Sequence, residues 1–278
     1  MSQGMVWLAS YPKCGNTWLR SFLTAYGHVD AQVDLNAMDS TIAASRLRLD
    51  AALGIETVDL LPHEIRELLP IGLREWAHTP NTPRFVKVHD ASGLTRDGKP
   101  LFPQDVTHGV IHLVRDPRDI VISLRHHRGS TLDATIQRLN DPQEWVAKGH
   151  RGIGAQVPQY LGDWTTHTRS WLESPLRRLT LRYEDMLAKP LDCFRQVVEF
   201  CGLPLDEAHL TQAVSATSFA SLKAKELAEG FRERPADASA PFFREGRAGG
   251  WKDVLSVAQI DAIVTTHGDM MRHFGYEL

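Results

Sequence analysis

The chain has 278 residues, of which 42% are hydrophobic and 23% charged, and its formal net charge is −3 at pH 7. This length and hydrophobic content suit a substantial core, so we expect residues 1–278 to form a single α/β domain. The slightly acidic balance argues against a general binder of nucleic acid or anionic membranes. An anion site would need a local concentration of positive charge, and two stretches supply one, Arg115 to Arg128 and Arg244 to Lys252.

The cysteine content and the hydropathy pattern predict a soluble protein in a reducing, cytoplasmic setting. The three cysteines, Cys14, Cys193 and Cys201, form no even-numbered disulfide framework and have no metal-ligand spacing. No stretch approaches the roughly 20 apolar residues that span a bilayer. The N-terminal residues do not show the basic and then apolar pattern of a signal peptide.

The first elements in chain order are a strand, a glycine-containing loop and a helix. Met5–Ala9 is apolar without alternation, which is typical of a strand buried on both faces. Pro12 and Gly15 interrupt the run, and a three- and four-residue apolar spacing then predicts a helix over 16–27. Lys13 and the N–H groups at the helix start can converge on phosphate or sulfate. The alternative is an ordinary turn with a surface lysine, because the loop lacks the Gly-Lys-Ser/Thr order of nucleotide P-loops.

Strands and helices alternate along the rest of the chain. Further strands are predicted at 84–89, 109–114 and 179–183. Helices are predicted at 117–127, 155–173, 190–202, 206–214 and 256–274, with several short pieces in 38–77. This order indicates a central parallel sheet flanked by helices, with ligands bound at the carboxyl ends of the strands. Residues 230–240 are polar without an apolar period, and we expect a mobile loop that is a candidate lid.

Six short motifs follow one another between residues 11 and 252. They are Tyr11–Trp18, Lys87–His89, Arg115 with Ser123, Tyr183–Met186, Thr217–Phe219 and Arg244–Lys252. Their sequences and order resemble those of the PAPS-dependent sulfotransferases, which use 3′-phosphoadenosine 5′-phosphosulfate. The resemblance is to the soluble, cytosolic type and its bacterial relatives. One such motif would be a weak signal, whereas six in the right order are specific.

The resemblance implies a P-loop-like strand-loop-helix and the transfer of a sulfuryl group from PAPS to a hydroxyl of a small-molecule acceptor, without a metal. It makes His89 the general base, and Lys13 and Lys87 the groups that stabilise the leaving phosphate oxygen and the sulfuryl group. A histidine after a strand is more often a surface residue, but the order Lys87-Val88-His89 favours catalysis. The implied cofactor-binding residues are Lys13, Cys14, Gly15, Asn16, Thr17, Trp18, Arg115, Ser123, Tyr183, Ser218, Phe219, Arg244, Glu245 and Gly246.

Several of these residues depart from the family pattern or allow a second interpretation. Cys14 replaces Ser, and a thiol at a helix start beside Lys13 would be reactive, unless it is only a small replacement. Asn16 replaces Thr, and Glu245 replaces Lys, which removes one positive charge that Arg247 can compensate. Gly250 stands in place of Asp. The ring residues of the cofactor site, Trp18, Phe219 and Tyr183, could instead be core aromatics.

Two other functions and one assembly remain open at this point. A phosphotransferase on a related fold would use Thr17 and Asp90 toward Mg²⁺, and a non-catalytic relative would only bind the nucleotide. Residues 252–261 are similar to a short dimerisation motif of the cytosolic enzymes and predict a homodimer; alternatively, Ser256 only caps a helix. The stretches expected to wall the acceptor, 28–80, 128–160 and 224–242, contain no recognisable code for its identity.

Overall fold

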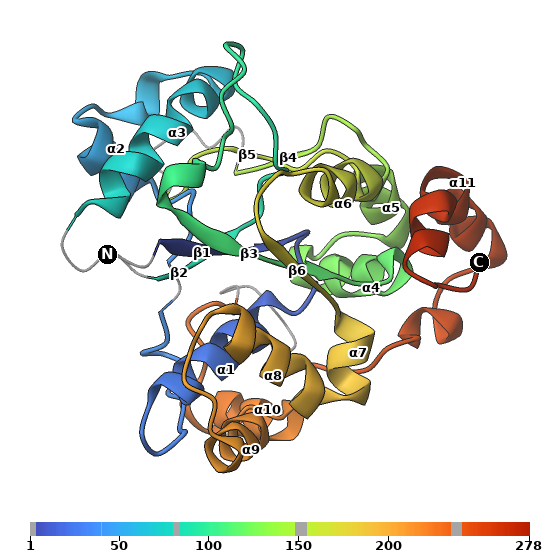
Figure 1. Ribbon diagram of the computed structural model, residues 1–278. Coiled ribbons are helices and arrows are strands. Elements are labelled where there is room, and N and C mark those ends of the chain that lie inside the picture. Colours follow the sequence, from blue (N-terminus) through green and yellow to red (C-terminus); the bar gives the residue numbers. More distant parts are fainter. Residues whose placement is uncertain (1–3, 40, 80–83, 148–154, 235–240) are drawn as a thin grey trace. The chain divides into compact units, whose positions relative to one another are not determined.

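The computed structural model describes residues 4–39, 41–79, 84–147, 155–234 and 241–278 (Figure 1). These residues group into two compact units. The first unit comprises described residues within 1–11, 41–112 and 140–180, and the second comprises those within 12–40, 113–139 and 181–278. The fold is α/β with a central parallel sheet flanked by helices, as the sequence predicts.

The sheet has the strand order β2-β1-β3-β6 (Figure 1). Its strands are β1 (Met5–Ser10), β2 (Phe85–Val88), β3 (Thr107–Val114) and β6 (Arg178–Arg182). All six residues of β1 are buried, which confirms the strand predicted to be covered on both faces. β1 and β2 are parallel, with Ala9 opposite Val88. The residues that follow this pair, Ser10 and His89, therefore lie at the same edge of the sheet.

The helices of the first unit are α2 (Arg46–Leu53), α3 (Pro62–Ala77) and α6 (Trp164–Leu172), with the 3-10 turns η1 (Thr57–Asp59) and η2 (Gln104–Val106). α2 packs against α3 (Figure 1). Buried side chains from β1, β2, α3 and α6 share one core, in which Trp7, Trp76 and Trp171 are the largest. This unit also contains an antiparallel ribbon of β4 (Trp145–Val146) and β5 (Gln159–Tyr160).

The predicted helix over 155–173 is wrong in its first half. Gln159 and Tyr160 are extended and pair with β4, and Gly162 has a positive φ of 63°. Pro158 lacks the N–H that a helix interior needs, and a left-handed glycine ends regular structure. The helix begins only at Trp164, where the carboxylate of Asp163 accepts a hydrogen bond of 2.7 Å from the Thr166 N–H.

The second unit is mainly helical. Its elements are α1 (Asn16–Gly27), α4 (Pro117–Arg128), α5 (Leu132–Leu139), α7 (Tyr183–Ala188), α8 (Pro190–Phe200), α9 (Glu207–Ala216), α10 (Phe219–Glu229), η3 (Gly250–Asp253) and α11 (Val257–His273). α9 packs against α1, α8 and α10, and α11 packs against α4 and α5 (Figure 1). The Asp116 side chain caps α4 by accepting from the Arg118 N–H at 2.9 Å.

The helices predicted at 16–27, 117–127, 190–202, 206–214 and 256–274 are confirmed to within two residues at either end. The strand predicted at 179–183 ends one residue earlier, and Tyr183 begins α7. α5, α7 and α10 were not among the predicted elements. Of the candidate lid, residues 235–240 lie outside the described part of the chain. No helix among the described residues is long and apolar enough to cross a membrane.

Candidate active site

The loop between β1 and α1 has a left-handed backbone at Lys13, with φ of 73°, and at Gly15, with φ of 95°. The positive φ at position 15 disfavours any residue other than glycine. A side chain is also excluded sterically there, because its Cβ would lie 2.8 Å from the Tyr183 ring. Lys13 is a non-glycine residue in this region of φ, a strain that is common in ligand-binding loops. The turn brings the loop directly to the N-terminus of α1, where the first N–H groups have no intrahelical acceptor.

A buried arginine holds the first polar side chains of α1. Arg20 Nε donates to Asn16 Oδ1 at 3.2 Å, and Nη2 donates to Thr17 Oγ1 at 3.3 Å. The Glu233 carboxylate neutralises this guanidinium at 2.8 Å. Since Arg20 occupies the oxygen atoms of both side chains, the Asn16 amide N–H and the Thr17 hydroxyl can act as donors. Asn16 therefore keeps a donor where the family has a hydroxyl.

Arg115 links the loop to the C-terminal basic segment. Its Nη1 donates to the Lys13 carbonyl at 3.1 Å, and its Nη2 donates to the Arg247 carbonyl at 3.2 Å. The guanidinium lies 4.2 Å from the centre of the Tyr183 ring. Its buried Nε has no hydrogen-bond partner among the described residues. Asp116, the residue after Arg115, pairs with Arg118 at 2.7 Å.

Several guanidinium groups lie close together around Arg244. Burial lowers the pKa of Arg244, and nearby Arg115, Arg125 and Arg247 lower it further, whereas Glu245 raises it. Glu245 contacts Arg244 at 3.2 Å and Arg247 at 2.8 Å. Like charges repel one another, so a bound anion would stabilise this group of arginines. Arg247 also pairs with Asp253 at 2.8 Å, which weakens the idea that it compensates for Glu245.

The predicted ring residues pack on their neighbours in this unit. Trp18 lies edge-on to Tyr183 with 6.0 Å between ring centres, and its buried Nε1 has no partner among the described residues. A Cβ at Gly246 would lie 2.2 Å from the Phe219 ring, so only glycine fits there. Ser218 caps α10 by accepting from the Ser221 N–H. Each of these rings is partly a packing residue, as the alternative interpretation expected.

The hypothesis of a reactive Cys14 is wrong. The side chain is fully buried, and burial raises the pKa of the thiol far above its ordinary value despite the nearby Arg115. A neutral buried thiol is unreactive, so Cys14 acts as a small residue in the position of Ser. Ser123 lies inside α4, two turns after the Asp116 cap, and is half-buried.

His89 follows β2 in the first unit, where its ring and main chain are both anchored. Its Nδ1 lies 2.8 Å from the Ser10 carbonyl oxygen, an acceptor, so Nδ1 carries the proton and Nε2 the lone pair of the neutral ring. The His89 carbonyl accepts from His167 Nε2 at 3.0 Å. Lys87 lies within β2, and its N–H donates to the Thr41 carbonyl at 3.0 Å.

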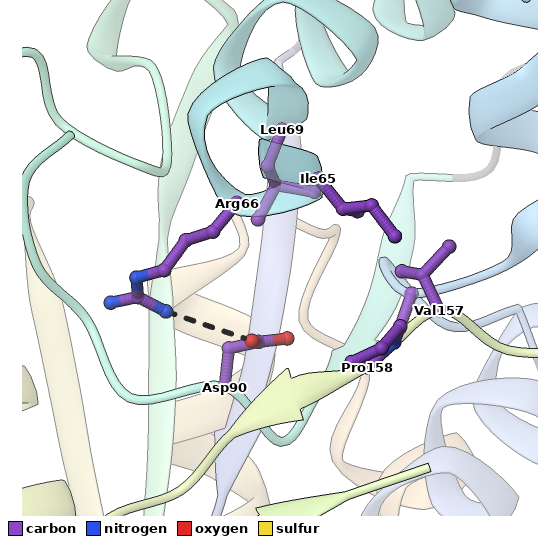
Figure 2. A pocket seen from close by; sticks show the side chains of 7 residues that line it. Ile65, Arg66, Leu69, Asp90, Val157 and Pro158 are labelled. Carbon is purple, nitrogen blue, oxygen red and sulfur yellow. Dashed lines mark ion pairs between the residues drawn. The ribbon is translucent and has the colours of Figure 1, made fainter. Parts of the chain in front are cut away.

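Asp90, the next residue, lines a small cavity with Arg66 and the apolar side chains of Ala44, Ile65, Leu69, Val157 and Pro158 (Figure 2). The Arg66 guanidinium approaches the carboxylate to 3.9 Å, and the Tyr160 N–H donates to it at 3.1 Å. Burial nevertheless raises the pKa of Asp90 to about 7. Asp90 thus belongs to a buried ion pair, which disfavours its use as a magnesium ligand. The described residues contain no cluster of three or more His, Cys, Asp or Glu suited to a metal ion.

Two further carboxylates position the C-terminal segment of the second unit. Asp119 accepts from the N–H groups of Gly249, at 2.7 Å, and Trp251, at 3.0 Å. Glu226 accepts from the N–H groups of Phe242 and Phe243. Phe242 in turn lies under Lys13, with Nζ 4.2 Å from the ring centre. Sequence reasoning assigned neither carboxylate, since each binds main chain that is distant in sequence.

The strand-loop-helix of β1 and α1 places a lysine and the start of a helix together, an arrangement that suits an anion site. The sequence profile of the sulfotransferase domain matches residues 3–275, and the chain belongs to this family. Cytosolic sulfotransferase 16 of Arabidopsis thaliana is 27% identical over 274 residues, covering 92% of this chain and 74% of the relative. Sulfotransferase 1A1 of Mus musculus is 29% identical over 212 residues, covering 73% of this chain and 67% of the relative. The family resemblance is therefore confirmed, and the protein is a sulfotransferase.

Solved structures share the fold. A mouse sulfotransferase solved with PAP has a TM-score of 0.62 and 19% identity, and the match covers 99% of this chain and 87% of that one. A retinol dehydratase solved with retinol and PAP has a TM-score of 0.63 and 21% identity, and the match covers 100% of this chain and 83% of that one.

Proposed function

We propose that this sulfotransferase transfers the sulfuryl group of PAPS to a hydroxyl of a small-molecule acceptor and releases adenosine 3′,5′-bisphosphate (PAP). The observation that carries the proposal is the group of Arg115, Arg244 and Arg247, in which Glu245 contacts the last two and Arg115 donates to the Arg247 carbonyl. This group lies in the same unit as the Lys13 loop and the start of α1. PAPS has two separated anionic ends, a 3′-phosphate and a phosphosulfate. Two basic sites in one unit match this charge distribution.

The residues of the second unit fit such a nucleotide by their chemistry. Lys13, Thr17, Asn16 and the first N–H groups of α1 would hold the 5′-phosphate and stabilise the charge that develops on its leaving oxygen. Arg115, with an unpartnered buried Nε, and Arg244 would hold the 3′-phosphate, together with Ser123. Trp18 and Phe219 offer flat apolar surfaces for the adenine. When bound, PAPS supplies the sulfuryl group.

His89 is proposed as the general base. The acceptor oxygen attacks sulfur and forms the new O–S bond while the bond from sulfur to the 5′-phosphate oxygen breaks, and its proton passes to His89 Nε2. The anchored Nδ1 supports this role, because it leaves the lone pair on the other ring nitrogen. Lys87 would polarise the sulfuryl group. Positioning and electrostatics account for the catalysis, by analogy with phosphoryl transfer.

Two assays test this function against the alternatives. In a thermal-shift assay, PAP should raise the melting temperature more than ATP with Mg²⁺ does; the reverse result would favour a phosphotransferase. Incubation with PAPS and a library of alcohols, phenols and amines, scored by mass, should give sulfated products. Nucleotide binding without any product would instead support a non-catalytic relative.

We also propose that residues 1–278 act as one sulfotransferase domain in the cytoplasm, since the family profile spans 3–275 and matching relatives are named cytosolic. A homodimer through residues 252–261 remains a prediction. Val257 in this segment is 75% exposed at the start of α11, which Ser256 and Gln259 cap. Sedimentation of the wild-type protein and Val257→Lys should show a dimer only for the former. A 31 kDa species alone at high concentration would contradict the dimer.

A further inference from the structure

Helix α6 contacts the chain that follows β2 through two donors on one face. His167 Nε2 donates to the His89 carbonyl at 3.0 Å, and Trp171 Nε1 donates to the Asp90 carbonyl at 3.0 Å. His167 and Trp171 are four residues apart, so they lie one above the other along the helix. Both side chains are fully buried. Two successive carbonyls after the strand are therefore fixed by one rigid element.

Other contacts complete the restraint on this segment. The Ala91 N–H donates to the Tyr160 carbonyl at 2.8 Å, and the Asp90 carboxylate accepts from the Tyr160 N–H. The His89 ring is held separately through its Nδ1 by the Ser10 carbonyl. The main chain and the side chain of His89 thus have independent anchors, and His167 bonds directly to the main-chain carbonyl.

The protonation state of His167 suits a donor and not a base. Burial lowers its pKa to about 4, although its bond to His89 raises it. The ring is therefore neutral near pH 7, with the proton on the bonded Nε2. Its Nδ1 has no hydrogen-bond partner within the described residues. Tyr11 packs edge-on against the ring, with 5.4 Å between the ring centres.

We infer that His167 is a positioning residue for the sulfuryl-transfer reaction, which holds the main chain of His89 so that the imidazole keeps its direction. The inference rests on the proposed role of His89 as the base. Displacing a catalytic group by about 1 Å can lower a rate about 100-fold, so one hydrogen bond behind the base can matter for turnover. His167 touches no reacting atom in this account.

The test compares two variants of similar size. His167→Gln keeps an N–H donor at the place of Nε2, whereas His167→Leu removes it. We expect kcat to fall about 10- to 100-fold in His167→Leu and to stay within about threefold of wild type in His167→Gln, with PAP affinity unchanged in both. His112→Leu is the matched control, because His112 is equally buried and its ring centre lies 6.4 Å from that of His167.

A second readout does not depend on turnover. In ¹⁵N-labelled protein, the Nδ1–H resonance of His89, assigned by its loss in His89→Ala, should persist in His167→Gln and broaden or shift in His167→Leu. If His167→Leu does not fold, Trp171→Phe should shift the same resonance. A normal kcat and a normal His89 resonance in His167→Leu would overturn the inference. A normal kcat in His89→Ala would instead refute the proposed base and leave the resonance test standing.

Discussion

His89 Nδ1 lies 2.8 Å from the carbonyl oxygen of Ser10, across the parallel pair of β1 and β2. The carbonyl can only accept, so this contact selects the tautomer with the proton on Nδ1. Ser10 is three residues before Lys13, so the strand that leads into the loop also orients the proposed base. We therefore expect activity to fall at acid pH, where protonation of Nε2 removes the lone pair.

The buried histidines should make stability depend on pH. The pKa of His167 is lowered from 6.5 to about 4, so its contribution to the free energy of unfolding is present above pH 6.5 and is lost as pH falls toward 4. Between pH 7 and pH 5 this amounts to about 2 kcal/mol. Asp90, with a raised pKa, contributes the opposite slope over the same range.

Urea unfolding of wild type and His167→Gln at several pH values isolates the histidine term. The unfolding free energy of wild type minus that of His167→Gln should decrease as pH falls from 7 to 5, because only wild type loses the contribution of the neutral histidine. A difference that stays constant over this range would show that His167 is not held neutral by burial.

Arg115→Ala should weaken PAP binding by about 1.5–3 kcal/mol, the scale of a lost hydrogen bond to a charged group. The structural reason is that the guanidinium lies between the Lys13 and Arg247 carbonyls and beside Arg244. Arg195→Ala is the control, because it removes the same charge from α8, where Arg195 forms an exposed ion pair with Glu207 of α9. The free energy of PAP binding to Arg195→Ala, measured by calorimetry, should stay within about 0.5 kcal/mol of that of wild type. Equal losses in both variants would mean that only net charge matters.

Glu245→Lys should tighten PAP binding by about 1 kcal/mol, the interaction of two unit charges about 4 Å apart in water. The change removes a carboxylate that neutralises Arg244 and Arg247. Glu245→Gln should give an intermediate affinity, and added salt should reduce the gain. Asp253 pairs with Arg247 but not with Arg244, so Asp253→Asn should have little effect on PAP affinity. Unchanged or weaker binding in Glu245→Lys would place this residue away from the 3′-phosphate.

The sequence predicted the elements whose signals are local. The apolar run before Pro12, the glycine at position 15 and the Asp-Pro cap of α4 each determine their own backbone, so β1, α1 and α4 fell in the right places. The predicted helix over 155–173 is too long because it neglects two local signals, Pro158 and Gly162, which end regular helix before α6 begins at Trp164.

The contacts that complete the site have no such local signal. Arg20 acts through Glu233, which is 213 residues away, and His167 acts on a carbonyl 78 residues away. The burial of Cys14 likewise depends on tertiary packing, which decides between the two interpretations left open by the sequence in favour of a small replacement for Ser. Only the resemblance to a family could assign His89 and Arg115 their roles in one reaction, and those roles remain predictions.

The most direct test of the account is turnover and nucleotide binding measured together on His89→Ala. Loss of a positioned base should lower kcat at least about 100-fold, with the acceptor that wild-type enzyme sulfates fastest. PAP affinity should stay nearly unchanged, because the proposed nucleotide contacts are Lys13, Thr17, Arg115, Ser123 and Arg244. Lys87→Ala provides the contrast, since it should impair transfer by weakening the hold on the sulfuryl group. Wild-type turnover in His89→Ala would contradict the mechanism, and failure of the variant to bind PAP would make His89 a structural or nucleotide-binding residue.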